Sequence, residues 1–345
     1  MILKETFSIN HINEIKENKK VDVNLLERSI YAFGLLEALS KVGMPFIFKG
    51  GTCLMLLLEN PRRLSTDIDI IVEPGTNVEN FIESASVIFP FKKVEKQNCK
   101  GKNNIEKVHY KFIYDSPLQN KEFYILLDIL FEKNHYQRLT EKPISSEILI
   151  TDKSDILVKV PTADCILGDK LTAFAPHTIG IRFGEDKNLE IIKQMFDIAC
   201  LAEISENFED TISTYYATSS SEIEYRGISI TSEYALIDTI ESAACIAGRG
   251  KYGTEYERYS AVMRNLTNHI YQGKFSGEIA AVLACTVMYM AVCVLKKQPP
   301  KKITDYKSYL TENISNSSFS KLSYIRKYDS KAFAYLVETI RLLEN

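Results

Sequence analysis

Two aspartates separated by a single residue, Asp67 and Asp69, are the side chains of this sequence best spaced to do chemistry together. They lead into an apolar run over residues 68–72 that has the composition of a buried strand. Residues two apart share one face of a strand, so both carboxylates should project together while Ile68 and Ile70 turn toward a core. Carboxylate oxygens are ligands that magnesium prefers, and the spacing therefore predicts a divalent-metal site.

A glycine-rich turn comes shortly before this strand. An apolar run at residues 46–48 predicts another strand, and residues 51–58 have the composition of an apolar helix. The turn between them reads Lys49-Gly50-Gly51-Thr52. Free backbone N–H groups at the start of a helix bind phosphates, so this turn suits a nucleoside triphosphate. Each motif alone has a plainer interpretation, a solvated strand end or an ordinary turn, but their order within one short segment favours the functional one.

The combined pattern resembles the nucleotidyltransferase superfamily with the polymerase-beta-like fold and, more narrowly, the AbiEii/AbiGii toxin family of bacterial abortive-infection and toxin–antitoxin systems. That family shows an apolar strand, KGGT, an apolar helix and R-x-S-x-D-x-D. The present chain matches the last motif with Arg63, Ser65, Asp67 and Asp69. The resemblance extends over roughly the first 200 residues and is strongest in these motifs. It implies transfer of a nucleoside monophosphate from an NTP to an acceptor hydroxyl, with release of pyrophosphate.

A third carboxylate, Asp128, lies in the otherwise apolar segment 123–130, which reads as a strand. Such a carboxylate is costly unless it is paired or bound to a metal, and a structural aspartate with a backbone partner is the alternative interpretation. The resemblance favours the metal, with Asp67, Asp69 and Asp128 holding two magnesium ions. One ion would lower the pKa of the acceptor hydroxyl, and the other would neutralise the leaving pyrophosphate.

The resemblance also implies a nucleotide-binding set around the glycine-rich turn. Its expected members are Lys49, Gly50, Gly51, Thr52 and Ser65. The backbone of the two glycines and the Thr52 hydroxyl would bind the β- and γ-phosphates. Ser65 is expected to cap the turn before the strand rather than to touch the substrate. The neighbouring Arg62 and Arg63 are expected to be solvated.

Two predicted helices, residues 163–174 and 188–202, carry the remaining candidates. In the family, a lysine at the start of such a helix contacts the triphosphate and a later helix supplies a functional aspartate. Lys170 and Asp197 match those places, and Lys170 would stabilise negative charge on the leaving group. The family usually shows an Asp-Leu-Tyr-Asp-Leu-like run, whereas this chain keeps only one aspartate there. Lys193 lies four residues before Asp197, so an ordinary ion pair is the alternative.

Length and periodicity set the frame for these motifs. A chain of 345 residues suits two domains, which we place at residues 1–160 and 161–345. The pattern predicts an α+β fold, in which an N-terminal nucleotidyltransferase domain with a mixed β-sheet flanked by helices precedes a mainly α-helical domain. The polar stretch 96–107 is expected to be a hairpin loop. The predicted strands are residues 46–48, 68–72, 91–94, 108–114 and 123–130, and the predicted N-terminal helices include residues 23–42 and 78–88.

Charge and composition exclude several classes of protein. The net charge of −3 is that of a molecule with no general attraction for polyanions. The longest apolar stretch, residues 279–295, is interrupted by Thr286 and reads as a buried helix, so no membrane partner is expected. The N-terminus has no signal-peptide core. The seven cysteines lack CxxC spacing, which predicts small core residues in a reducing, cytoplasmic compartment.

Two basic stretches bear on the acceptor. Residues 296–331 hold nine Lys or Arg against three Asp or Glu, with four tyrosines interleaved, and residues 92–107 hold six Lys against two Glu. Basic residues attract phosphates and aromatic rings stack on bases, so RNA, including tRNA, is the expected acceptor. Each stretch alone is more typical of a solvated face. The glycine-rich break at residues 248–253 is either a basic loop facing a cleft or a connection between helices.

Three functions stay open on this sequence. The leading one is a magnesium-dependent nucleotidyltransferase toxin that uses an NTP, modifies RNA and is paired with an antitoxin protein, as the resemblance implies. The second is a nucleotidyltransferase acting on a small molecule, such as an aminoglycoside, which would favour an acidic pocket rather than basic patches. The third is a nucleotide-binding or partner-binding module without catalysis. Retention of all three carboxylates disfavours this last function.

Overall fold

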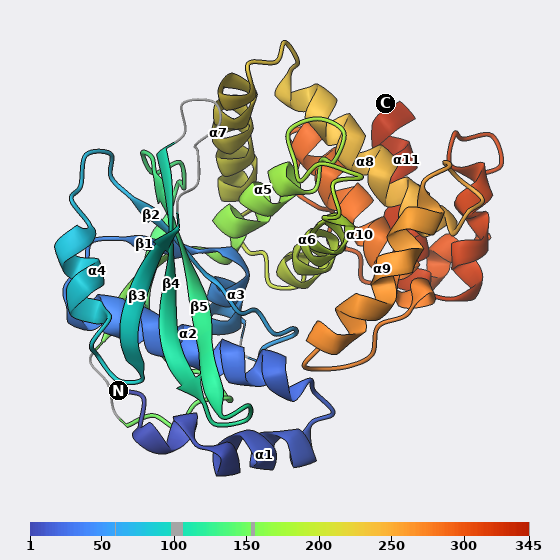
Figure 1. Ribbon diagram of the computed structural model, residues 1–345. Coiled ribbons are helices and arrows are strands. Elements are labelled where there is room, and N and C mark those ends of the chain that lie inside the picture. Colours follow the sequence, from blue (N-terminus) through green and yellow to red (C-terminus); the bar gives the residue numbers. More distant parts are fainter. Residues whose placement is uncertain (59, 98–105, 153–155, 345) are drawn as a thin grey trace. The chain divides into compact units, whose positions relative to one another are not determined.

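The computed structural model describes residues 1–58, 60–97, 106–152 and 156–344, which form two compact units (Figure 1). The mixed sheet and the helical C-terminal region are both present, so the predicted fold class is confirmed. The division at residue 160 stays a prediction. The first unit comprises Met1–Asn134, Arg138–Thr162 and Asn268–Gly273, and the second comprises His135–Gln137, Ala163–Thr267 and Lys274–Asn345.

The first unit is built on a five-stranded sheet with the order β1-β2-β5-β4-β3. Its strands are β1 (Ile47–Lys49), β2 (Ile68–Val72), β3 (Phe91–Gln97), β4 (Glu106–Ser116) and β5 (Lys121–Phe131). β2 runs parallel to β5, and the other neighbouring pairs are antiparallel. All five predicted strands are therefore present, with slightly different ends. Most of the predicted hairpin loop, residues 98–105, lies outside the described residues.

The two faces of this sheet differ in burial. On β5, Leu127 and Ile129 are at most 1% exposed, whereas Asp128 between them is half-buried. Helix α2 (Val23–Lys41) covers the Leu127 side, where the ring of Tyr31 stacks on Tyr114 of β4 with centroids 3.8 Å apart. Because successive side chains of a strand alternate between faces, Asp128 projects from the face opposite α2.

The remaining elements of the first unit frame the sheet. Helix α4 packs on β3 and α2, and β7 lies beside β1. The pair β6–β7 was not predicted, because both strands are short and β6 carries three consecutive polar residues instead of an alternating pattern. The bounds of these elements are η1 (Lys4–Phe7), α1 (Ile9–Asn18), α3 (Gly50–Leu57), α4 (Glu79–Ala85), β6 (Leu139–Pro143) and β7 (Leu157–Pro161).

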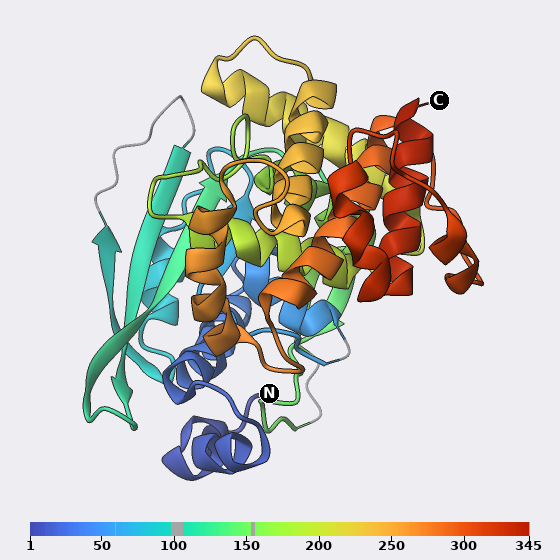
Figure 2. The same ribbon diagram turned by 90° about the vertical axis from the view of Figure 1, so that its right-hand side faces the viewer.

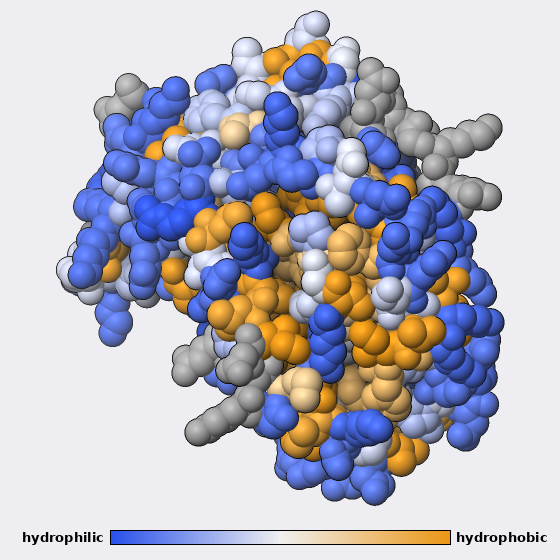
Figure 3. All heavy atoms as spheres, turned by 90° about the vertical axis from the view of Figure 1, so that its left-hand side faces the viewer, coloured by the Kyte–Doolittle hydropathy of each residue, from blue (hydrophilic) through white to orange (hydrophobic). Residues whose placement is uncertain are grey.

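Large apolar side chains are also exposed on the first unit. Phe89 is 53% exposed, although its ring packs edge-on against Phe7 with centroids 5.5 Å apart. Figure 3 shows hydrophobic side chains gathered over the middle of one face of the molecule, with hydrophilic side chains around them. Apolar atoms make up much of any protein surface, so this exposure alone assigns no function. The other exposed members in this unit are Met1, Ile9, Val87, Ile150 and Leu157.

The second unit consists of helices. α8 packs along α10, α11 packs on α10, and α5 lies against both α6 and α7. Figure 2 shows α10 and α11 side by side, in orange and red. The glycine-rich residues 248–253 connect α8 to α9. The helices are α5 (Ala163–Ala173), α6 (Asn188–Ala202), α7 (Phe208–Arg226), α8 (Ser232–Gly248), α9 (Tyr256–His269), α10 (Gly277–Leu295), η2 (Lys307–Thr311), η3 (Ser320–Lys327) and α11 (Ser330–Glu344).

Helix α10 forms the centre of the second unit. Within the described part of the chain it is the one helix long and apolar enough to cross a membrane by length and composition, and 72% of that apolar stretch is buried inside the protein. Cys285 and Cys293 lie on it, both buried. Burial raises the pKa of each thiol to about 12. This agrees with the prediction of a buried core helix carrying cysteines as small apolar residues.

Candidate active site

The candidate carboxylates belong to one row of side chains that crosses the sheet. Asp69 of β2 lies directly opposite Lys49 of β1 on one side and Asp128 of β5 on the other. Asp128 in turn lies directly opposite His109 of β4. Residues paired in this way project from the same face of a sheet. Two acidic and two basic side chains are thus aligned on the face opposite α2.

Asp69 lies against the first residue of helix α3. A Cβ atom added to Gly50 would come within 2.1 Å of Asp69 Oδ2, and Gly50 has a φ of +81°, in the left-handed region that glycine prefers. Both observations explain why the sequence needs glycine here. The partial positive charge at the N-terminus of a helix stabilises a carboxylate at this place and attracts phosphate in the same way.

The second glycine of the turn brings the two sequence motifs into contact. A Cβ atom on Gly51 would lie 2.7 Å from Ser65 Oγ and 2.8 Å from Arg63 Nη2. Arg63 is 7% exposed, and its Nη1 donates to the carbonyl of Leu64 at 3.2 Å. The expectation of a solvated Arg63 is therefore wrong, because its guanidinium is used to pack the segment before β2 onto the turn. Arg62 is half-buried and donates to Gln272 at 3.3 Å.

The segment before β2 is also held by residues of Asn268–Gly273, which belong to the same first unit. The amide of Leu64 donates to the carbonyl of His269 at 2.7 Å, and Arg63 and Ile270 form an isolated β-bridge. These residues lie about two hundred positions apart, so no local sequence signal predicts their pairing. The contact fixes the backbone that leads into the strand carrying Asp69.

Thr52 has a different role from the expected one. It is fully buried, and its hydroxyl donates to the backbone carbonyl of Asp67 at 2.7 Å. The expected contact of this hydroxyl with a phosphate is not met in this structure, because a fully buried oxygen that already donates to a carbonyl does not face a ligand. Thr52 instead ties the first turn of α3 to the residue that opens the Asp-x-Asp motif.

Asp67 and Asp128 each have a basic partner. Arg28 of α2 approaches Asp67 Oδ1 with its Nη2 at 3.4 Å, and the Thr66 hydroxyl donates to the same oxygen at 3.3 Å. Asp128 Oδ1 lies 2.5 Å from His109 Nδ1. The side chains of Asp67 and Asp128 remain 45% and 32% exposed. Both carboxylates are therefore paired and still reachable by a ligand.

His109 and Arg28 were missed by the sequence analysis. His109 belongs to a predicted strand, but only the β4–β5 register places it beside Asp128. Its one available signal was that a carboxylate inside an apolar strand needs a partner. Arg28 lies in a predicted helix among apolar residues, and nothing in its spacing connects it with Asp67.

The carboxylates fit a divalent cation in part. Asp69 and Asp128 are adjacent cross-strand partners with oxygen donors, which suits magnesium, and Gly50 leaves room for the Asp69 carboxylate. Within residues 1–58, 60–97, 106–152 and 156–344, no three His, Cys, Asp or Glu side chains are grouped as one metal site. Asp67 is directed to Arg28 and Thr66. The three-carboxylate site stays a prediction.

The candidates of the second unit form a buried pair. Lys170 Nζ lies 2.9 Å from Asp197 Oδ2 and donates to Gln194 Oε1 at 2.8 Å. The two charged side chains are only 8% and 2% exposed. The alternative pair between Lys193 and Asp197 is wrong, because Lys193 binds Glu190 at 2.8 Å instead. Lys170 and Asp197 are thus joined, as residues that act together would be.

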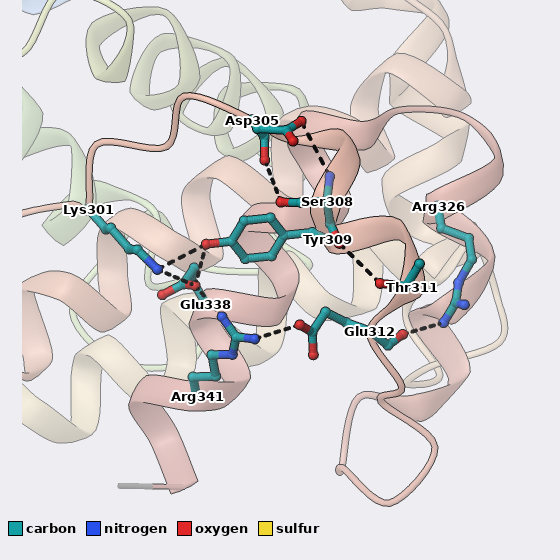
Figure 4. Close-up of polar contacts among 9 residues, drawn as sticks. All are labelled: Lys301, Asp305, Ser308, Tyr309, Thr311, Glu312, Arg326, Glu338 and Arg341. Atoms are coloured by element: carbon teal, nitrogen blue, oxygen red, sulfur yellow. Dashed lines mark hydrogen bonds and ion pairs between the residues drawn. The ribbon is translucent and has the colours of Figure 1, made fainter.

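Many of the basic residues that suggested an RNA surface are bound within the chain (Figure 4). Lys301 donates to Tyr309 at 3.1 Å and to Glu338 at 3.2 Å. Arg326 donates to backbone carbonyls, including that of Glu312 at 3.1 Å. These two cations therefore stabilise the C-terminal helices. In the other stretch, Lys92, Lys93 and Lys96 form ion pairs with Asp115, Glu122, Glu95 and Glu79.

Comparison of the sequence with known protein families identifies the family of this chain. Residues 34–243 match the model of the family described as nucleotidyl transferase AbiEii toxin, type IV TA system. The chain belongs to this family. It is therefore a nucleotidyltransferase, and the matched segment contains the glycine-rich turn, the three candidate carboxylates and the Lys170–Asp197 pair. Arg28 precedes the matched segment.

Solved structures give only a distant likeness. The crystal structure of JHP933 from Helicobacter pylori is 15% identical, with a TM-score of 0.45, and the match covers 79% of this chain and 93% of that chain. A second crystal structure from H. pylori is 14% identical, with a TM-score of 0.45. The match covers 79% of this chain and 96% of that chain. The family assignment rests on the sequence match, because these likenesses are too distant to support it. No curated protein matches the chain.

Proposed function

We propose that this nucleotidyltransferase moves a nucleoside monophosphate from an NTP to a hydroxyl of an RNA acceptor, with magnesium bound by the aligned aspartates. The single observation that carries the proposal is the row of Lys49, Asp69 and Asp128 next to the start of α3. It combines carboxylate oxygens for a cation, backbone N–H groups for phosphates and a lysine on the same face. These are the groups that transfer of a nucleotidyl group requires.

Each part of the row has a role in this proposal. The backbone of Gly50 and Gly51 binds the β- and γ-phosphates, because the N-terminus of α3 leaves N–H groups without helical partners. Lys49 adds positive charge on the same face. Asp69 and Asp128, with Asp67 as the third ligand, hold magnesium, which when bound would polarise the phosphate oxygens and the acceptor hydroxyl. Ser65 packs against the turn and fixes its backbone.

We assign the buried Lys170–Asp197 pair to the same reaction. Lys170 supplies a fixed positive charge for the triphosphate, and Asp197 together with Gln194 orients its ammonium group. A buried cation held by two partners keeps its place without reorganisation when negative charge develops on a leaving group. The support for this assignment is that both residues lie within the segment matched by the family and contact each other.

The acceptor in this proposal is RNA, with tRNA the first to test. Support comes from basic side chains that keep their exposure, including Lys302 and Lys327, and from Tyr328, whose ring is 58% exposed. Exposed lysines contact phosphates, and an exposed aromatic ring stacks on a base. We further propose that the protein acts in the cytoplasm, where its thiols stay reduced, and that an antitoxin protein is encoded for it, as the family description suggests.

One assay tests the proposal. Purified protein is incubated with magnesium, total RNA and each labelled NTP in turn, and the products are separated on a denaturing gel. Label should enter RNA from at least one NTP and should disappear when EDTA replaces magnesium. The Asp69→Asn variant serves as the matched control. Transfer to an added aminoglycoside but not to RNA would favour a small-molecule acceptor, and transfer to neither would contradict the proposal.

A further inference from the structure

We propose that His109 is a positioning residue of the active site, which fixes the orientation of the Asp128 carboxylate for the bound cation. The inference rests on the proposed function, because it assumes that Asp128 is a ligand. It adds a residue that belongs to neither sequence motif and lies on a different strand from every candidate carboxylate. The observations that carry it are the contact itself, the strand register and the exposure of both side chains.

The contact is short and directional. His109 Nδ1 lies 2.5 Å from Asp128 Oδ1, closer than the distance of about 2.7–2.9 Å typical of an N–H donor and a charged oxygen. An ionised carboxylate only accepts hydrogen bonds, so Nδ1 is the protonated ring nitrogen and donates a hydrogen bond to Oδ1. With Oδ1 held in this way, rotation of the carboxylate about its last torsion is restricted. The direction of Oδ2 is then set before any ligand arrives.

The strand register fixes this contact, because it joins two residues whose backbones are paired in the sheet. His109 and Asp128 are direct partners of the antiparallel β4–β5 ladder, which runs without a break from Glu106↔Phe131 to Ser116↔Lys121. On the other side Asp128 is the direct partner of Asp69. His109 therefore holds the outer side of Asp128, and the side toward Asp69 is left for a shared ligand.

Exposure separates this role from ordinary packing. The side chains of His109 and Asp128 are 25% and 32% exposed, so neither is needed to fill the core. A fully structural pair would be expected to lie on the α2 side, where Leu127 and Ile129 are buried. Carboxylates that ligate metals are commonly held by a second hydrogen-bonding group, and loss of that group typically costs 10–100-fold in metal affinity or activity.

The test measures cation binding directly, without turnover. Manganese stands in for magnesium, and its binding to the nucleotide-free protein is followed by electron paramagnetic resonance. The variant His109→Leu should weaken manganese binding about tenfold, at the low end of the range for loss of such a partner. The variant His109→Asn keeps an N–H donor near the position of Nδ1 and should bind within about threefold of the wild type, because the direct hydrogen bond is restored.

Nucleotidyl transfer supplies a second readout. In His109→Leu, kcat at saturating metal should fall while KM for the NTP stays within about twofold, because Gly50 and Gly51 bind the phosphates independently of β4. Lys111→Gln is the matched control, since Lys111 lies on the same strand and face but is paired with Leu126. This control should bind manganese and transfer label as the wild type does. If His109→Leu does not fold, His109→Gln replaces it, because its longer amide misplaces the donor.

The outcomes are distinct. Wild-type manganese binding in His109→Leu, together with weakened binding in Asp128→Asn, would overturn the role of His109 and leave the proposed function intact. Failure of His109→Asn to recover binding would also overturn positioning, since a group acting through its other ring nitrogen is not replaced by an amide. If Asp69→Asn and Asp128→Asn both bind manganese and transfer label normally, the proposed site fails, and the role of His109 fails with it.

Discussion

The carboxylates of the two units are held in opposite ways. In the first unit, Asp128 has one described partner, His109, and its side chain is 32% exposed. In the second unit, Glu338 is 7% exposed and accepts from Tyr309 at 2.7 Å, from Arg341 at 2.7 Å and from Lys301 at 3.2 Å (Figure 4). At Glu338 three donors converge on one oxygen, Oε1, and the residue is buried, so this carboxylate stabilises the fold. One with a single partner and an exposed remainder keeps the capacity to bind a ligand.

This difference gives a physical criterion for reading acidic residues. Burial of a charge is tolerated only when donors surround it, so a buried carboxylate with three donors, such as Glu338, reports on structure. Asp197 lies between the two cases, because it is buried like Glu338, at 1% exposure, but lies in the segment that matches the family. Variants in which stability and transfer activity are both measured test whether each residue is structural, like Glu338, or able to bind a ligand, like Asp128.

The largest effect is expected from breaking the buried pair of the second unit. Lys170→Met should lower the free energy of unfolding by about 3–5 kcal/mol, because it leaves the Asp197 charge buried without its main partner. Urea denaturation gives this value. The double variant Lys170→Met/Asp197→Leu should recover most of the stability, since no unpaired charge remains.

The double variant also separates structure from catalysis. If it folds stably and transfers no label, the pair serves the reaction, and if it transfers label normally, the pair is structural like Glu338. Lys193→Gln provides the matched control, because Lys193 lies on α6 and pairs with the half-exposed Glu190. Its effect on stability should stay below about 1 kcal/mol.

The second-largest effect is expected for Asp69, which lies in the row of aligned side chains across the sheet of the first unit. Asp69→Asn should reduce nucleotidyl transfer by roughly 10²–10³-fold, the range for loss of one electrostatic stabiliser, because the amide keeps the size but not the ligand charge. The melting temperature should change by only a few degrees, since Asp69 is not fully buried. Calorimetry and the labelled-NTP assay measure the two quantities. A variant that keeps wild-type transfer would remove Asp69 from the site.

The comparison also explains what the sequence could predict. Asp67, Asp69 and the glycine-rich turn could be proposed from the sequence because their proposed function depends on local spacing, two residues along the chain and the start of one helix. Asp128 could be proposed as a candidate because a charge in an apolar strand is unusual. His109 was not found, because its role depends on the register between β4 and β5, and register is a property of the folded sheet.

The basic stretch at residues 296–331 shows the opposite kind of error, in which composition suggested a surface from residues that are bound within the chain. Its composition indicated an RNA surface, yet Lys301 and Arg326 are bound to partners within the second unit. A count of charges along the chain does not show that Lys301, whose side chain is 57% exposed, is paired with Glu338, which lies much later in the sequence. The buried Arg63 illustrates the same limit in the first unit.

A smaller effect is expected for Glu338. Burial raises its pKa, but the hydrogen bonds from Tyr309, Arg341 and Lys301 outweigh burial and lower the pKa below its ordinary value of 4.5. A carboxylate with a depressed pKa contributes stability above its unfolded pKa, and that contribution is lost as the pH falls through the folded pKa. The free energy of unfolding should therefore decline as the pH is lowered below about 4.5.

Glu338→Gln tests this assignment. The variant should lose about 1–3 kcal/mol at neutral pH, because Lys301 and Arg341 lose a charged acceptor, and its stability should depend less on pH below 4.5. Urea denaturation at several pH values provides both results. Transfer of label by the folded variant should equal that of the wild type. A selective loss of transfer would instead group Glu338 with carboxylates that bind a ligand, as proposed for Asp128.

The smallest effect concerns Lys302 and Lys327, two exposed lysines of the second unit that do not contribute to the Glu338 contacts. Replacing Lys302 and Lys327 with Gln should weaken binding of labelled RNA and lower the slope of log affinity against log salt by about one for each phosphate that is no longer neutralised. Fluorescence anisotropy over a series of salt concentrations measures both.

The matched pair is Lys301→Gln with Arg326→Gln, which removes the same charge from side chains that bind Glu338 and backbone carbonyls. This second pair should lower the melting temperature and leave the salt slope unchanged. If both pairs change the slope equally, the partners within the chain do not prevent Lys301 and Arg326 from binding RNA, and the division between structural and available charges fails for this surface.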